Sequence, residues 1–480
     1  MSKVVIIGAG LAGSLLAIYL ARRGMAVDVY EARGDMRLEE VAAGRSINLA
    51  LSDRGIAALR EVGMDEYMLA EAVPMYGRMI HSVSGETKLL PYSGRKGEYI
   101  NSVSRAGLNV ALINEAEKYE GVAFHFNERC VDLDRESGEA VFSSGKRVKG
   151  ETLIATDGAG SAVRQAMEKQ MSDFESSSVF LEHGYKELHI PPSNKLQFVD
   201  PQESDKLKFV GQSNKLQFVD PRESDKLKFV GHLETNALHI WPRHQFMMIA
   251  LPNADGSFTC TLFLDKDKLS GMDSETAVLD FFRREFPDAV PMMPTLVKDF
   301  MHNPTGDLGT VKCWPWNIGG KVLLLGDAAH AMVPFYGQGM NCAFEDVRML
   351  DSLIESQRSE PPASAGGQTD WEPIFESYAK LRKPNTDAIQ DMAVENFYEM
   401  RDATADPVFQ RKRALETRLE HTFPDYFSKY SMVTFREDLP YSVAKEKGNA
   451  QDRMLMEICS RVDDVSTIPL EEIMVKVNDL

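Results

Sequence analysis

The residues of this sequence that are best suited to chemistry are glycines and carboxylates that follow short apolar runs. The first such group is Gly8-Ala9-Gly10-Leu11-Ala12-Gly13, with Glu31 further along the chain. In a GxGxxG turn the first glycine permits the tight turn, the second lets a pyrophosphate approach the backbone, and the third lets the following helix pack closely. The free N–H groups at the helix N-terminus attract the phosphates. Glu31 can accept hydrogen bonds from ribose hydroxyls and would repel a 2′-phosphate, so this group predicts FAD or NAD, and not NADP.

Two later segments also bring a strand end to a carboxylate that is followed by small residues. TLIATDGAGSAVRQAM (152–167) places Asp157 after a strand, and LLLGDAAHAMVPFYGQGMNCAFED (323–346) places Asp327 there. Ligands of open α/β sheets bind outside the carboxyl ends of the strands, so we expect both residues in the cofactor site. Asp327 is placed to accept a hydrogen bond from a ribityl hydroxyl, and Gly326 leaves room for the cofactor chain. Together with the first group, these segments favour FAD.

The second segment continues into another glycine-rich turn, Gly337-Gln338-Gly339-Met340-Asn341. This turn opens a helix, whose N-terminus can face the electron-rich edge of a flavin ring. Small residues at this place admit a flat isoalloxazine ring. We therefore assign these five residues to the cofactor site.

The elements that must position the first group form a strand–helix–strand unit. Residues 4–7 are a continuous apolar run, as expected for a strand that is buried on both faces of a parallel sheet. A helix to about Ala21 and a second strand over residues 26–30 follow. The predicted fold is α/β, with a Rossmann-like, doubly wound FAD domain and an antiparallel sheet domain beside it.

Length and composition limit the remaining possibilities. A chain of 480 residues exceeds one compact core, and a net charge of −18 argues against wrapping a nucleic acid. The five cysteines and ten histidines are dispersed, without metal-ligand spacing, so reduced thiols and no metal site are expected. The chain shows neither a signal segment nor an apolar run of membrane-spanning length, which favours a cytoplasmic protein.

Taken together, GAGLAG with Glu31, the DG turn at Asp157 and GDAAH at 326–330 resemble the group A flavoprotein aromatic hydroxylases. Within that group, further segments are similar to the kynurenine 3-monooxygenase family: GRSINLALSDRG (44–55), GRMIH (77–81), NALHIWPR (236–243), MVPFYGQGMNCAFEDV (332–347) and YSMVTF (430–435). The similarity extends from residue 3 to about residue 436. The C-terminal membrane anchor of eukaryotic members is not recognised here, so a soluble, bacterial-type form is expected.

The resemblance implies a tightly bound, non-covalent FAD that is reduced by NADPH, a transient co-substrate. It also implies that O₂ is trapped as a flavin C4a-hydroperoxide and that one oxygen is transferred to L-kynurenine, giving 3-hydroxykynurenine. The absence of a second strand–GxGxxG–helix unit and of a redox CxxxxC motif is independent of the resemblance. A two-dinucleotide dithiol reductase would need both.

The resemblance also implies a set of site residues. Arg78 and Tyr92, with Tyr430, would bind the substrate carboxylate, for which a guanidinium offers a two-pronged fork. The other implied residues are Asn396, Glu399 and Met400 on a closing helix, Ile249, Leu251 and Phe263 in the pocket wall, Pro334 and Phe335 at the flavin edge, and Arg105 at a flavin phosphate. No side chain is assigned as catalytic, because the flavin carries the chemistry.

Without the resemblance, these residues have ordinary explanations that stay open. Arg78 and Arg105 could be surface arginines, and Asn396 and Glu399 could belong to an exposed helix face. Ile249, Leu251 and Phe263 would then be core residues.

The expected domain division is discontinuous. An FAD domain covers 1–72, 99–178 and 299–360, a substrate-binding sheet domain covers 73–98 and 179–298, and a helical cap and tail cover 371–480. A Pro/Gly/Ser-rich link occupies 356–370. A near-identical tandem repeat at 193–231 is expected to form a hairpin or a mobile loop, and the last forty residues carry no recognisable signal.

Two other functions remain alternatives at this stage. The chain could hydroxylate another small aromatic compound, such as anthranilate or a phenol, or it could be a non-catalytic FAD-fold binding protein. Arg78 and Tyr92 beside an intact GDAAH favour the enzyme. A homodimer is compatible with the sequence, which does not fix the oligomeric state.

Overall fold

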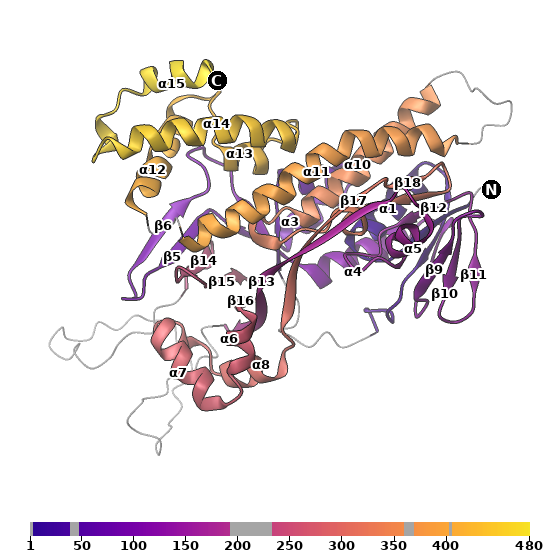
Figure 1. Ribbon diagram of the computed structural model, residues 1–480, viewed down its shortest axis with the longest axis horizontal. Coiled ribbons are helices and arrows are strands. Elements are labelled where there is room, and N and C mark those ends of the chain that lie inside the picture. The colour runs from indigo at the N-terminus through magenta and orange to yellow at the C-terminus, as the bar shows by residue number, and fades with distance from the viewer. Residues whose placement is uncertain (1–2, 39–47, 193–232, 360–368, 403–405) are drawn as a thin grey trace.

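The computed structural model of the protein describes residues 3–38, 48–192, 233–359, 369–402 and 406–480. The tandem repeat at 193–231 lies outside the described residues. Figure 1 shows the long helices of the last third of the chain running between a mostly parallel sheet and a C-terminal helical group (yellow).

The first sheet has the strand order β18-β19-β12-β1-β2-β8. Its strands are β1 (Lys3–Ile7), β2 (Ala26–Tyr30), β8 (Val122–His125), β12 (Thr152–Ala155), β18 (Asn317–Ile318) and β19 (Val322–Leu324). All pairs are parallel except β18 with β19. Helix α1 (Leu11–Arg22) joins β1 to β2, so the predicted strand–helix–strand unit is confirmed, with the helix one residue longer than expected.

The second sheet has the order β17-β13-β16-β15-β14-β5-β6. Its strands are β5 (Gly77–His81), β6 (Thr87–Pro91), β13 (Glu175–Ile190), β14 (Leu238–Pro242), β15 (Met247–Pro252), β16 (Phe258–Asp265) and β17 (Gly306–Trp314). Neighbours are antiparallel, except that β14 and β5 run parallel. The predicted α/β fold with an added antiparallel sheet is therefore confirmed, whereas the exact domain boundaries remain a prediction.

Two three-stranded sheets complete the strands. One joins β9 (Cys130–Asp134), β10 (Glu139–Phe142) and β11 (Arg147–Val148), and the other joins β3 (Asn48–Leu51), β4 (Val73–Met75) and β7 (Ile100–Ser104). The helices before residue 340 are α2 (Asp53–Glu61), α3 (Asp65–Ala70), α4 (Arg105–Ala116), α5 (Ala162–Gln170), α6 (Lys266–Gly271), α7 (Glu275–Glu285), α8 (Leu296–His302) and α9 (Asp327–His330), with short 3-10 turns η2 (Val290–Met292) and η3 (Pro334–Tyr336).

The last third of the chain is helical. Its elements are α10 (Gly339–Ser359), α11 (Trp371–Asp402), α12 (Pro407–Thr422), α13 (Lys429–Thr434), α14 (Tyr441–Ser460), η5 (Val465–Thr467) and α15 (Leu470–Asn478). Helix α10 continues into the first residues of the predicted link, so that link begins later than expected. The last forty residues form α14 and α15, and Leu455 and Ile473 from them share an apolar cluster with Leu415 of α12. No helix of the described residues is both long and apolar enough to cross a bilayer.

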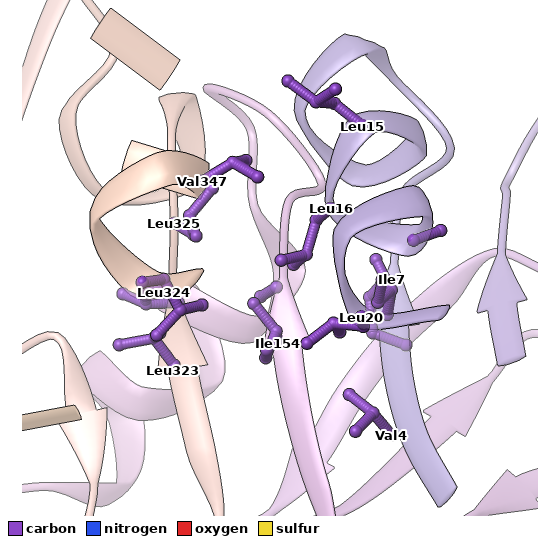
Figure 2. Close-up of a cluster of buried hydrophobic side chains, with 14 of the residues drawn as sticks. Val4, Ile7, Leu15, Leu16, Leu20, Ile154, Leu323, Leu324, Leu325 and Val347 are labelled. Carbon is purple, nitrogen blue, oxygen red and sulfur yellow. The ribbon is translucent and has the colours of Figure 1, made fainter. Parts of the chain in front are cut away.

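The main core lies between the parallel sheet and the helices that cover it. Figure 2 shows Leu16 and Leu20 of α1 converging with Ile154 of β12 and with Leu323 of β19. These side chains are all less than 2% exposed. Burial of this continuous apolar surface fixes β1, β12 and β19 side by side, so the loops that follow the three strands must emerge together at one edge of the sheet.

Candidate active site

The loop between β1 and α1 uses its three glycines in three different ways. Gly8 has φ +102°, and a Cβ there would come within 2.6 Å of the Thr156 carbonyl oxygen. A Cβ on Gly13 would collide with the Gly8 carbonyl oxygen. Around Gly10, by contrast, nothing of the described chain lies within 4 Å of a built Cβ. Gly8 therefore permits a turn that lies close against Thr156, Gly13 lets α1 pack closely, and the backbone at Gly10 is not covered by the described chain.

Glu31 stands at the end of β2 beside this loop. Its Oε2 accepts a hydrogen bond from the Ala9 N–H at 2.9 Å, and Oε1 accepts from the Arg33 backbone N–H at 3.0 Å and from Arg33 Nε at 2.7 Å. Burial alone would raise the pKa of Glu31, but the hydrogen bonds and charge of Arg33 hold it below its usual value. The loop thus meets an ionised carboxylate, which suits hydroxyl donors and repels a further phosphate.

The loop after β12 ties the first loop to the third. Thr156 Oγ1 donates to the Gly8 carbonyl at 2.8 Å. Asp157 Oδ2 accepts from the Ala162 N–H at 2.8 Å and so caps α5, whereas its Oδ1 is buried without a hydrogen-bond partner among the described residues. Arg164 of α5 donates from Nη1 to the Ala328 carbonyl at 2.7 Å. The hydrogen bond of Asp157 in this structure therefore serves the start of α5. Burial raises the pKa of Asp157.

The loop after β19 comes directly against the start of α1. Gly326 has φ +63°, and a Cβ there would lie 3.5 Å from Ala12 Cβ and 3.3 Å from Ala343 Cβ. Asp327 is exposed at the first position of α9, while the two alanines after it are buried. The structure thus brings together the first and third predicted segments and leaves the Asp327 carboxylate accessible.

The side chains of the turn before α10 are largely engaged by the protein itself. Asn341 Oδ1 accepts from the Ser52 N–H at 3.0 Å, and its Nδ2 donates to the Ala50 carbonyl at 2.8 Å. Gln338 Oε1 accepts from the Tyr441 hydroxyl at 3.0 Å. Both amides are buried, and Met340 packs against the main core. Any contact of this turn with a cofactor would therefore come from its backbone.

Arg105 is the exposed first residue of α4. This helix reaches the glycine loop through Asn109, whose Nδ2 donates to the Ala9 carbonyl at 3.0 Å. Leu11, in the first turn of α1, packs partly against the core. Arg105 thus begins a helix that contacts the loop, and its place at a flavin phosphate stays a prediction.

His330, the last residue of α9, joins three helices through a buried ionic network. Its Nε2 donates to Asp346 Oδ2 at 2.6 Å, and Arg382 Nε donates to Asp346 Oδ1 at 2.6 Å. Cys342 lies in the same group, but the Arg382 guanidinium contacts it as well. A cation already fills this position, which suits a structural link between α9, α10 and α11 better than a metal site.

Arg78 of β5 lies in a second cavity with residues from the C-terminal helices. Tyr430, Asn396 and Glu399 line the same cavity. The Arg78 guanidinium carbon is 4.9 Å from the centre of the Tyr430 ring and 5.7 Å from that of Tyr92. The two tyrosine rings stack at 5.1 Å. The structure thus brings together residues from three separate regions of the sequence: Arg78 and Tyr92, Asn396 and Glu399, and Tyr430.

Two polar atoms in this cluster lack partners. Arg78 Nε and the Tyr92 hydroxyl are buried without a hydrogen-bond partner among the described residues. Burial raises the pKa of Tyr92 well above its usual value, so the hydroxyl remains a donor. Two buried donors side by side fit an anionic ligand that accepts from both, because an unpaired buried donor is otherwise costly.

The predicted wall residues surround this cluster. The ring centres of Phe263 of β16 and Phe335 are 4.9 Å apart, and Leu251 of β15 shares an apolar cluster with Tyr92. Ile249 packs against both the cluster of Phe263 and Phe335 and the cluster of Leu251 and Tyr92. Pro334 is exposed, and Met400 is buried with Phe335 in one cluster. Asn396 Nδ2 donates to the Phe335 carbonyl at 2.6 Å, so this amide fixes the turn that carries the wall.

Several cavity residues are missing from the predicted set. Tyr336, which the sequence left without a role, stacks on Tyr430 at 5.6 Å. Charged residues of the C-terminal helices also line the cavity: Lys412, Arg413, Glu416, Lys429 and Asp452. They form ion pairs, such as Asp452 with Lys412 and with Lys429, both at 2.6 Å. Their local sequence looks like an ordinary solvated helix face, and only the tertiary pairing distinguishes them.

Comparison with known proteins places these features in a family. The FAD binding domain family matches residues 1–237 and 281–359. The kynurenine 3-monooxygenase of Myxococcus xanthus is 43% identical over 476 residues, with 96% of this chain and 92% of that protein covered. That of Dictyostelium discoideum is 41% identical, with 96% and 94% covered.

Solved structures show the same fold at low identity. The tetrameric form of 2-methyl-3-hydroxypyridine-5-carboxylic acid oxygenase superposes with a TM-score of 0.62 at 19% identity, covering 88% of this chain and 98% of that one. The p-nitrophenol 4-monooxygenase PnpA from Pseudomonas putida gives 0.61 at 16% identity, covering 95% and 99%.

Proposed function

Because this chain belongs to the kynurenine 3-monooxygenase family, we propose that it uses FAD, NADPH and O₂ to convert L-kynurenine to 3-hydroxykynurenine. The observation that carries the substrate assignment is the pair of buried, unpartnered donors on Arg78 and Tyr92, next to the stacked rings of Tyr430 and Tyr336 that reach the cavity. L-Kynurenine offers both a carboxylate and an aromatic ring. These are the two groups that such a cavity would select.

The three converging loops fit FAD. The open backbone at Gly10 and the N-terminus of α1 receive the pyrophosphate, and the ionised Glu31 accepts ribose hydroxyls. Asp327, exposed beside the small residues of α9, accepts a ribityl hydroxyl. Bound FAD supplies the redox chemistry, namely hydride uptake from NADPH and activation of O₂.

The chain's own part in the reaction is to orient the substrate and exclude water. Arg78 binds the carboxylate through a planar fork, and the Tyr92 hydroxyl donates to the same group. Phe263 and Phe335 confine the aromatic ring, and Leu251 closes the wall. With one end of the substrate anchored by charge, the ring has few orientations left, which favours reaction at a single ring carbon.

The proposed activity is tested by following NADPH oxidation in the purified, yellow protein. We expect L-kynurenine to accelerate oxidation and anthranilate or simple phenols to have little effect, because only kynurenine offers an α-amino acid end to Arg78. Faster oxidation with one of those aromatics than with kynurenine would favour the alternative hydroxylase. A protein that binds FAD but oxidises NADPH with none of them would be a binding protein.

The Asp327 assignment gives a separate prediction. Asp327→Ala is expected to weaken FAD binding by about 1 to 3 kcal/mol, since it removes an acceptor for a cofactor hydroxyl. The matched control is Asp307→Ala, which removes a carboxylate that is 64% exposed on β17 and paired with Lys266. The FAD dissociation constant is measured by flavin fluorescence during titration of the apoprotein. Equal affinities in the two variants would remove Asp327 from the cofactor site.

A further inference from the structure

The GRMIH and NALHIWPR segments, which carry part of the family resemblance, meet in a buried hydrogen-bonded chain. His81 Nδ1 lies 2.9 Å from Asp288 Oδ2, His81 Nε2 lies 2.8 Å from His239 Nδ1, and His239 Nε2 lies 2.8 Å from the Glu234 carbonyl oxygen. Both rings are less than 5% exposed. Asp288 Oδ2 also accepts from Trp241 Nε1 at 2.8 Å, and the His81 ring stacks on Trp241 at 4.1 Å.

The number of protons in this chain follows from its two ends. A carboxylate oxygen and a carbonyl oxygen can only accept, so the three contacts need three N–H protons between them. Two neutral imidazoles carry one N–H proton each, which leaves one contact without a proton. The chain of contacts is complete only when it holds one proton more than two neutral rings supply.

The extra proton belongs on His81. Burial lowers the pKa of His239 to about 4, so that ring is neutral, donates from Nε2 to Glu234 and accepts at Nδ1. Burial would raise the pKa of Asp288, but its hydrogen bonds from His81 and Trp241 hold it below the usual value, so it is an anion. His81 must then donate from both nitrogens. Stacking on Trp241 suits a cationic ring.

The other charged group at this place comes from the end of β14. Arg243 donates from Nη1 to the His81 carbonyl at 3.1 Å and from Nε to the Glu285 carbonyl at 2.6 Å. Burial lowers the pKa of Arg243, and the negative charges of Asp288 and Glu285 act against that shift. Asp288 thus lies between two cations, Arg243 and His81.

This chain lies directly behind the substrate arginine. Strands β5 and β14 are parallel neighbours, with Arg78 opposite Leu238 and Met79 opposite His239 (Figure 1). Side chains alternate along a strand, so Arg78 faces the cavity and His81 faces the opposite side of the sheet. The contact between His81 and His239 therefore joins β5 to β14 on the face of the sheet opposite Arg78. These two strands set the position of Arg78.

We propose that His81 is a positioning residue for substrate binding: held doubly protonated between Asp288 and His239, it fixes β5 so that Arg78 meets the substrate carboxylate. Loss of the extra proton leaves one contact with two facing lone pairs, which loosens the join behind Arg78. Breaking this join should raise the KM for kynurenine while kcat changes little. This inference rests on the proposed function only for its choice of substrate.

Asp288→Ala is the decisive variant. It removes the acceptor at one end, so two neutral rings supply the two contacts that remain, and the contact between His81 and His239 is kept. In the Asp288→Ala holoenzyme we therefore expect a kynurenine KM close to that of the wild type. In His81→Phe, which breaks that contact, we expect the KM to rise about three- to tenfold while kcat changes little.

The protonation state of each ring is measured by ¹⁵N NMR of holoenzyme labelled at histidine. The His81 signals are assigned as those that are missing from the spectrum of His81→Phe. The wild type should show one doubly protonated ring that disappears in Asp288→Ala. Asp280→Ala, on an exposed carboxylate of the preceding helix α7, is the matched control and should behave as wild type. Two neutral rings in the wild type, a doubly protonated ring that persists in Asp288→Ala, or a wild-type KM in His81→Phe would overturn the inference. A protein that does not turn over kynurenine would refute the proposed function instead, and the NMR result would still decide the protonation of His81.

Discussion

Arg78→Ala is expected to raise the KM for L-kynurenine about ten- to a hundredfold while FAD stays bound. A charge-assisted fork to a carboxylate contributes about 1.5 to 3 kcal/mol, which corresponds to that range. The cofactor loops lie on other strands, so flavin content should be unchanged. Steady-state kinetics and the flavin absorbance of the purified variant give both quantities.

Two controls separate recognition from structure at Arg78. Arg78→Lys keeps the charge but not the planar fork, so it should not restore the wild-type KM. The KM for a kynurenine analogue without the α-carboxylate should hardly change in Arg78→Ala. If the KM for the analogue rises as much as the KM for kynurenine, Arg78 serves the fold, and other residues bind the amino acid end.

Gly10→Ala is expected to give a folded protein that has lost FAD. Gly10 has φ −72° and ψ −174°, which any residue can adopt, and a Cβ would meet nothing of the described chain within 4 Å. Stability should therefore change by no more than about 0.5 kcal/mol. A pyrophosphate held against this backbone would meet the new methyl group, and we expect the FAD dissociation constant to rise by about a hundredfold or more, some 2.7 kcal/mol.

The neighbouring glycines and a distant one provide the comparison. Gly13→Ala places a Cβ against the Gly8 carbonyl and 2.5 Å from Thr156 Oγ1, so this variant should lose stability as well as FAD. Gly271→Ala, at the end of α6, also has nothing within 4 Å and should lose neither. Thermal unfolding and flavin absorbance distinguish the three. Wild-type flavin content in Gly10→Ala would show that the pyrophosphate does not approach this loop.

The strand–helix–strand unit and the three cofactor loops could be predicted because their signals are local. Four apolar residues in a row define β1, and Gly8, Gly10 and Gly13 stand at the recognisable spacing of a GxGxxG turn. A helical cap from residue 371 onward was expected, but the packing of its helices against one another could not be predicted in the same way. Leu415 and Ile473 lie 58 positions apart (473 − 415), and their shared cluster forms only when α12 and α15 pack together.

In the site, too, local signals could be predicted and tertiary contacts could not. The sequence indicates Gln338 and Asn341 as part of the loop, but not that Tyr441 and Ser52 engage their amides. Asp452 gave no signal, because a carboxylate on a polar helix usually faces water. Its two lysine partners come from different helices and appear only in the folded chain. The domain boundaries and the roles of the site residues stay predictions that the variants above test.

The most direct test of the central claim is the product formed from L-kynurenine with NADPH under ¹⁸O₂. Mass spectrometry should find 3-hydroxykynurenine that carries one labelled oxygen on the ring. Its amount should not exceed the NADPH consumed, since each turnover takes one hydride from NADPH. NADPH consumption with kynurenine present but without any hydroxylated kynurenine, or a product without the label, would contradict the assignment.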